Sequence, residues 1–103
     1  MTRLQDLAQV IRSKNSGPFE ITFDVIFAQS EAYQRVRSSG VLTPALVCKL
    51  YSVPEDDIVA LLFFEPALAF KFTLRRNWAQ GSIGERDTFG AQQYAPLMAI
   101  EIP

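Results

Sequence analysis

Strict alternation of apolar and polar residues over Phe19 to Phe27 constrains the fold of this chain more than any other feature. Five apolar side chains occupy every second position: Phe19, Ile21, Phe23, Val25 and Phe27. Glu20, Thr22 and Asp24 fill the positions between them. Because consecutive side chains of a strand point to opposite faces, this pattern predicts a half-buried β-strand whose apolar face meets helices.

Two later segments are predicted as strands of the same sheet. Ile58 to Phe64 is apolar at every position, which is typical of a central strand that is buried on both faces. Leu68 to Leu74 alternates again between large apolar residues and small or polar ones. Leu4 to Ile11 fits either one face of a helix or a strand, and we favour a short strand that ends near Arg12. A last strand is expected over Leu97 to Ile102.

Helix signals lie between the alternating strand over Phe19 to Phe27 and the apolar strand over Ile58 to Phe64. Ser30 is expected to cap one helix that stops at Gly40, and Thr43 is expected to cap a second helix that begins at Pro44. A short helix ending near Gln93 is expected before the last strand. This order predicts an α+β fold, a ferredoxin-like split βαβ sandwich with an extra N-terminal strand and a mainly antiparallel sheet.

Composition narrows the functional classes. A chain of 103 residues with a net charge of −1 suggests one domain over residues 1–103, with no general attraction to nucleic acid or anionic membranes. No apolar run approaches a membrane span or a signal peptide. The single cysteine, Cys48, fits a reducing, cytoplasmic location. The chain lacks histidine, the commonest metal ligand, and we expect neither a metal nor a cofactor.

The most suggestive polar segment is a run of six residues just before the alternating strand: Arg12, Ser13, Lys14, Asn15, Ser16 and Gly17. Arginine and lysine suit a carboxylate or phosphate, and a glycine-containing turn can direct backbone amides toward an anion. The alternative is a polar turn between two strands, where asparagine, serine and glycine are also expected. The run therefore predicts either an anion site or a turn.

Four further residues are candidates for a second part of this site. Asp24 and Lys71 lie on strands that are expected to be neighbours, so they can form a surface ion pair or contribute to binding. Gln92 and Gln93 can both donate and accept hydrogen bonds. No catalytic residue stands out, since neither a histidine nor a cluster of acids or cysteines is present to act as an independent catalytic centre.

Several motifs resemble a known family in order and spacing over nearly the whole chain: "IRSKNSGPFEITFDVIF", "GVLT", "LYSVPEDD", "PALAFKFTLRR" and "GAQQYAPLMAIEIP". They resemble a small bacterial family of unknown function whose members are neighbours of acyclic terpene utilisation (AtuA-type) proteins. That family is similar to the ferredoxin-like C-terminal domain of AtuA proteins. The opening motif of that domain is matched here by Arg12, Ser13 and Gly17.

The resemblance implies a partner subunit. We expect an accessory or small subunit of an AtuA-type enzyme that handles an organic acid or acyl-CoA, in a homo- or hetero-oligomer. The polar run would supply a carboxylate-binding corner. The alternatives are a stand-alone small-molecule-binding or assembly domain without catalysis and, more weakly, an independent lyase with Lys14 or Lys71 as base.

Overall fold

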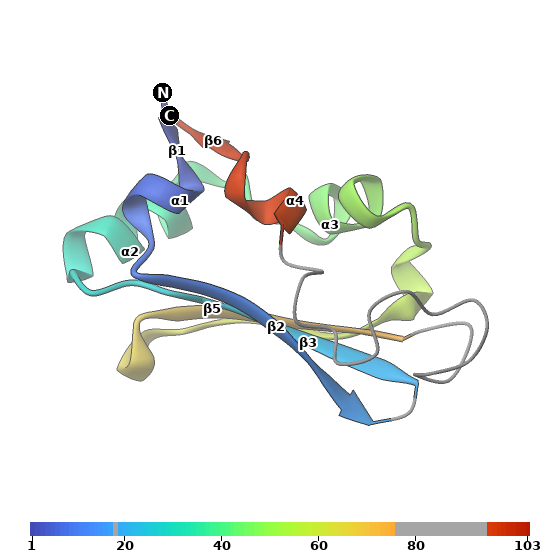
Figure 1. Cartoon of the computed structure of the whole chain (residues 1–103). Coiled ribbons are helices and arrows are strands. Elements are labelled where there is room, and N and C mark those ends of the chain that lie inside the picture. Colours follow the sequence, from blue (N-terminus) through green and yellow to red (C-terminus); the bar gives the residue numbers. More distant parts are fainter. Residues whose placement is uncertain (18, 76–94) are drawn as a thin grey trace.

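A computed structural model describes residues 1–17, 19–75 and 95–103 of the chain. Within these residues, the helices lie on one side of a four-stranded antiparallel sheet, and no described helix covers the other side (Figure 1). We call the uncovered side of this sheet the outer face. The α+β class and the antiparallel sheet predicted from the sequence are thereby confirmed.

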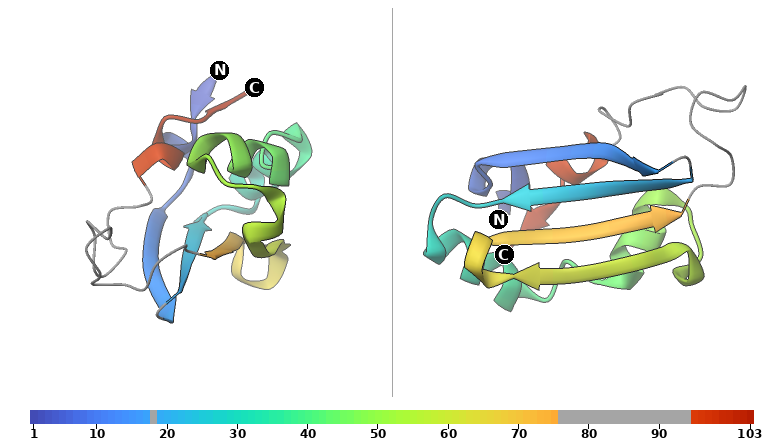
Figure 2. Two further views of the ribbon diagram at one scale, coloured as in Figure 1. Left: turned by 90° about the vertical axis from the view of Figure 1, so that its right-hand side faces the viewer. Right: turned by 90° about the horizontal axis from the view of Figure 1, so that it is seen from below.

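The sheet consists of β2 (Val10–Gly17), β3 (Glu20–Ile26), β4 (Ile58–Phe64) and β5 (Ala69–Arg75), in the order β2-β3-β5-β4 (Figure 2). Every neighbouring pair is antiparallel. Because β3 and β4 both run opposite to β5, they are parallel to each other, and β5 lies between them.

The predicted position of Ile58 to Phe64 inside the sheet is wrong. β4 is an edge strand that pairs with β5 alone among the described strands. Three of its large side chains are exposed: Val59 at 46%, Leu62 at 43% and Phe64 at 44%. An apolar run on both faces therefore does not mark a central strand here, because the outer face of the sheet has no covering layer of described residues.

The N-terminal segment also differs from the prediction. Leu4–Leu7 forms the short helix α1, and the strand that was expected to end near Arg12 instead runs from Val10 to Gly17. The polar run is thus most of a strand, not a loop. Ser13 and Asn15 occupy its inner positions, where apolar residues would have revealed a strand pattern.

Two helices cover the inner face of the sheet. α2 (Ser30–Ser39) ends at Gly40, whose φ of 70° is readily adopted only by glycine. α3 (Pro44–Tyr51) begins as predicted, with the Leu46 amide donating to Thr43 Oγ1 at 3.2 Å. The signals predicted at Gly40 and Thr43 are confirmed, whereas the predicted cap Ser30 is the first residue of α2, whose N-cap is Gln29.

Aromatic side chains join the helices to the sheet. The rings of Phe23 and Phe72 are stacked with their centroids 4.4 Å apart, and Tyr51 of α3 lies 4.9 Å from Phe23. Tyr33 of α2 is fully buried and meets Phe63 at 5.9 Å. Ile21, Phe23 and Val25 face this core as predicted, whereas Phe19 precedes β3 and is 51% exposed.

The two ends of the described chain lie side by side (Figure 1). β1 (Thr2–Arg3) and β6 (Glu101–Ile102) form a separate two-stranded antiparallel sheet. The predicted last strand over Leu97 to Ile102 is therefore mostly wrong, because its first two residues belong to the helix α4 (Ala95–Met98) and its strand is confined to Glu101–Ile102. Arg35 ties both ends to α2 by donating to the Pro103 carbonyl at 3.0 Å and to Thr2 Oγ1 at 2.9 Å.

Short 3₁₀ turns flank β4 on both sides, at Glu55–Asp57 and Glu65–Ala67. None of the described helices is long and apolar enough to span a membrane.

Candidate functional site

A row of four side chains crosses the outer face from one edge of the sheet to the other. Arg12 on β2 lies opposite Asp24 on β3, Asp24 lies opposite Lys71 on β5, and Lys71 lies opposite Leu62 on β4. Residues that are directly opposite in antiparallel strands share a face and are close enough to interact. The strand registers therefore bring the predicted Asp24 and Lys71 together and add Arg12 to them.

The Asp24 carboxylate is held between two cations. Arg12 Nε donates to Asp24 Oδ2 at 3.0 Å, and Lys71 Nζ lies 3.7 Å from Asp24 Oδ1. The side chain of Asp24 is only 5% exposed, whereas those of Arg12 and Lys71 are 57% and 45% exposed. The two cations thus cover the carboxylate and keep much of their own surface open to solvent or a ligand.

A second row lies beside the first. Lys14 is opposite Thr22, Thr22 is opposite Thr73, and Thr73 is opposite Ala60. The two threonine hydroxyls form a hydrogen bond of 2.9 Å. Lys14 is exposed, and none of the ion pairs found among the described residues includes it.

The outer face is positively charged and partly apolar at this point. The two rows carry three cations and one carboxylate, so positive charge is in excess although the whole chain has a net charge of −1. Exposed apolar side chains border the charges. Leu62 lies at the end of the first row, and Val10 and Phe64 lie at the two ends of the neighbouring row on the side away from Lys14. Such a surface can bind an acidic group that also carries apolar parts.

The predicted polar run does not act as one cluster on this face. Arg12 and Lys14 point outward, whereas Ser13 and Asn15 alternate to the inner face, where Ser13 is buried. The register shifts between Asn15 and Gly17, leaving Ser16 exposed at the irregularity. Gly17 ends the strand with a φ of 155°. The strand therefore separates the two cations from the serine and asparagine that lie between them.

Gln92 and Gln93, the remaining predicted site residues, lie outside the described residues.

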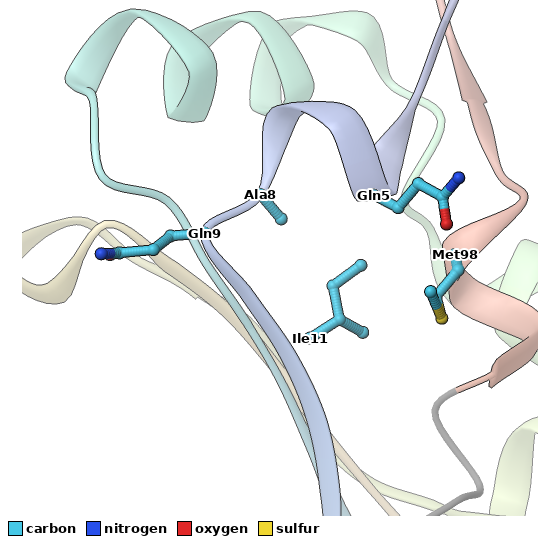
Figure 3. Close-up of a pocket in the computed structure, with 5 residues that line it drawn as sticks. All are labelled: Gln5, Ala8, Gln9, Ile11 and Met98. Carbon is cyan, nitrogen blue, oxygen red and sulfur yellow. The ribbon is translucent and has the colours of Figure 1, made fainter.

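A small hollow lies on the opposite side of β2 from the two cations, at the start of the strand (Figure 3). Its volume is about 240 Å³, and its lining residues are Gln5, Ala8, Gln9, Ile11 and Met98. Pockets for drug-sized ligands usually enclose about 300–1,000 Å³. The hollow is therefore too small to enclose an acyl-CoA.

The described residues offer little for acid–base or metal chemistry. They contain no group of three or more histidine, cysteine or carboxylate side chains placed to hold a metal ion. Burial raises the pKa of the Tyr51 phenol above its ordinary value of 10.0, so this phenol stays protonated near neutral pH. Tyr51 belongs to the core between α3 and the sheet, which makes it a packing residue.

Sequence reasoning missed the apolar part of the outer face. Leu62 and Phe64 were assigned to a buried strand, and Val10 was not singled out. The relevant signal is that Val10, Arg12 and Lys14 occupy every second position of β2. Once the segment is taken as a strand, this spacing places the valine and the two cations on the same face of the sheet.

The fold and this surface define a small α+β domain with an open, cationic sheet face. The chain belongs to the family described as "Domain of unknown function (DUF4387)", whose model matches residues 4–101. Comparison with curated proteins gives no match, and neither does comparison with solved structures.

Proposed function

We propose that this chain is an accessory subunit that binds an AtuA-type protein through its outer face and supplies cations for an organic acid or acyl-CoA substrate. The observation that carries the proposal is the excess of positive charge on an uncovered sheet face that also exposes Leu62 and Phe64. A partner protein would cover the apolar residues. A carboxylate or phosphate would meet the open sides of Arg12, Lys14 and Lys71.

The identity of the partner rests on the resemblance of the sequence motifs to neighbours of AtuA-type proteins. The strand arrangement supports a relation to the ferredoxin-like C-terminal domain of those proteins, because β3 and β4 are parallel with β5 between them, as in a split βαβ unit. The position of β2 beside β3 is where such a sandwich holds its last strand, and we propose that β2 replaces it.

A stand-alone ligand-binding domain is the second candidate, because the hollow lined by Gln5 and Met98 offers a place for a small ligand. We rank it below the subunit, because the volume of about 240 Å³ is less than the usual volume of a pocket for a drug-sized ligand. An independent lyase receives less support, because a lysine base has to be desolvated and the Lys71 side chain is 45% exposed.

Co-purification with an AtuA-type protein from the same genome tests the proposal. We expect a stable complex, and we expect Lys14→Met to weaken it about thirtyfold, which corresponds to about 2 kcal/mol. Lys14 is the suitable position because it is exposed and does not hold Asp24, so the fold should survive its loss.

Lys49→Met provides the matched control. Lys49 is an exposed lysine on α3, on the helical side of the sheet, so its loss removes the same charge from the other side of the molecule. We expect this variant to bind the partner like the wild type. Failure to form any complex, or equal losses for both variants, would show that the outer face is not the binding surface.

A further inference from the structure

The outer edge of β4 is an unprotected strand edge. β4 pairs with β5 on one side, and no described strand pairs with its other side. A free edge exposes main-chain N–H and C=O groups that another strand can pair with, and monomeric proteins usually block such edges with charges, proline or bulges. The seven residues of β4, Ile-Val-Ala-Leu-Leu-Phe-Phe, contain no charged residue, no proline and no glycine.

The other edge of the same sheet, formed by β2, is protected. It carries the exposed cations Arg12 and Lys14, and its register shifts before Gly17. In β4 the irregularity is confined to Ile58–Ala60, so the strand from Ala60 to Phe64 continues with regular pairing. Figure 2 shows the two edges on opposite sides of the sheet. The contrast indicates that β4 is the edge suited to association.

The side chains of β4 suggest which strand pairs with it. Ala60, Leu62 and Phe64 lie on the outer face in the order small, medium and large, and all three are exposed. Leu61 and Phe63 are half-buried on the inner face. If β4 of a second copy runs antiparallel beside this strand, its Phe64 lies next to Ala60 of the first copy, and its Ala60 lies next to Phe64. The order of sizes is therefore complementary to itself.

We propose that β4 pairs antiparallel with β4 of a second copy, around a two-fold axis at Leu62. This register sets Leu62 against Leu62 and each Phe64 against Ala60 of the other copy. On the inner face it sets Leu61 against Phe63. No charges meet within the paired segment, and the contact is isologous, as a two-fold interface requires. The two sheets become one antiparallel sheet of eight strands whose outer faces are continuous.

The free chain provides the first test, without any AtuA-type partner. Sedimentation equilibrium should give twice the chain mass of 11.6 kDa at micromolar concentration. Ala60→Lys should raise the dissociation constant of the dimer at least about a hundredfold, because a charged side chain occupies the place of the opposing Phe64 ring. Val10→Lys is the matched control, since Val10 is also an exposed outer-face residue of an edge strand, and it should remain dimeric.

Disulfide trapping tests the register and does not depend on the stability of Ala60→Lys. Opposed residues in antiparallel strands have Cα atoms about 4.5–5.5 Å apart, within the range that a disulfide spans. In a Cys48→Ala background, Leu62→Cys should therefore form an intermolecular disulfide upon oxidation, and Val10→Cys should not. A monomeric wild-type chain, a folded Ala60→Lys variant that stays dimeric, or equal trapping at both cysteines would overturn the proposal.

Discussion

Arg12 donates through Nε to the buried Asp24 carboxylate at 3.0 Å, across the pairing of β2 with β3. This contact makes Arg12 part of the folded structure as well as of the cationic outer face. Lys14, two residues along the same strand and face, lacks such a contact among the described residues. The two cations of the polar run therefore have different roles, and substitutions of the two residues should change the free energy of unfolding by different amounts.

Arg12→Met is expected to lower the free energy of unfolding by about 1–2 kcal/mol, because Asp24 stays buried and, among the described residues, keeps only the more distant Lys71 as an ion-pair partner. Lys14→Met should change it by no more than about 0.5 kcal/mol. Urea unfolding of both variants measures the difference. Equal stabilities would mean that solvent replaces the Arg12 contact without loss.

Thr43→Ala is expected to lower the free energy of unfolding by about 1 kcal/mol, because the Leu46 amide loses the hydroxyl that accepts its hydrogen bond at 3.2 Å. Thr43→Ser keeps an accepting oxygen and should lose much less. Thermal or urea unfolding of the two variants provides the comparison. Similar losses for serine and alanine would indicate that the methyl group of the threonine, and not the cap, stabilises this end of α3.

Tyr33→Phe is expected to leave the protein equally stable or up to about 1 kcal/mol more stable. The Tyr33 hydroxyl is buried without a hydrogen-bond partner among the described residues, and an unsatisfied buried hydroxyl is unfavourable. Tyr33→Leu, which also loses ring contacts with Phe27 and Phe63, should be clearly destabilising. A marked loss of stability in the phenylalanine variant would mean that the hydroxyl is bonded in solution.

Alkaline pH is expected to destabilise the protein through Tyr51. Burial raises the pKa of this phenol in the folded state above 10.0, so the stability it contributes is complete below pH 10.0 and falls as the pH rises further. One such group changes the free energy of unfolding by at most about 1.4 kcal/mol per pH unit. Urea unfolding between pH 9 and 11 should show a smaller decline for Tyr51→Phe, and identical declines would exclude Tyr51 as the cause.

Local patterns in the sequence predicted most of the individual elements. Alternation over residues 19–27 and 68–74 anticipated β3 and β5, because one face of each is in the core and the other is not. Gly40 and Thr43 marked the end of α2 and the start of α3, since caps are satisfied by residues within a few positions of the helix end. Ile58–Phe64 was correctly expected to be a strand.

The candidate site was predicted only in part. Asp24 and Lys71 were expected on neighbouring strands, and the structure pairs them. Arg12 was assigned to a loop because the polar Ser13 and Asn15 beside it interrupt the apolar period that reveals a strand. Its contact with Asp24 depends on the register between β2 and β3, which joins residues twelve positions apart.

The sequence by itself determined which segments are strands and helices and where several of them begin and end, because these choices depend on neighbouring residues. Only the tertiary structure decided the order of the strands, which places β4 at an edge and pairs β6 with β1 instead of β3. An apolar residue has the same local pattern whether its face is covered by helices or left open. Leu62 and Phe64 are exposed because the described helices pack on one side of the sheet alone, and this arrangement depends on contacts between distant segments of the chain.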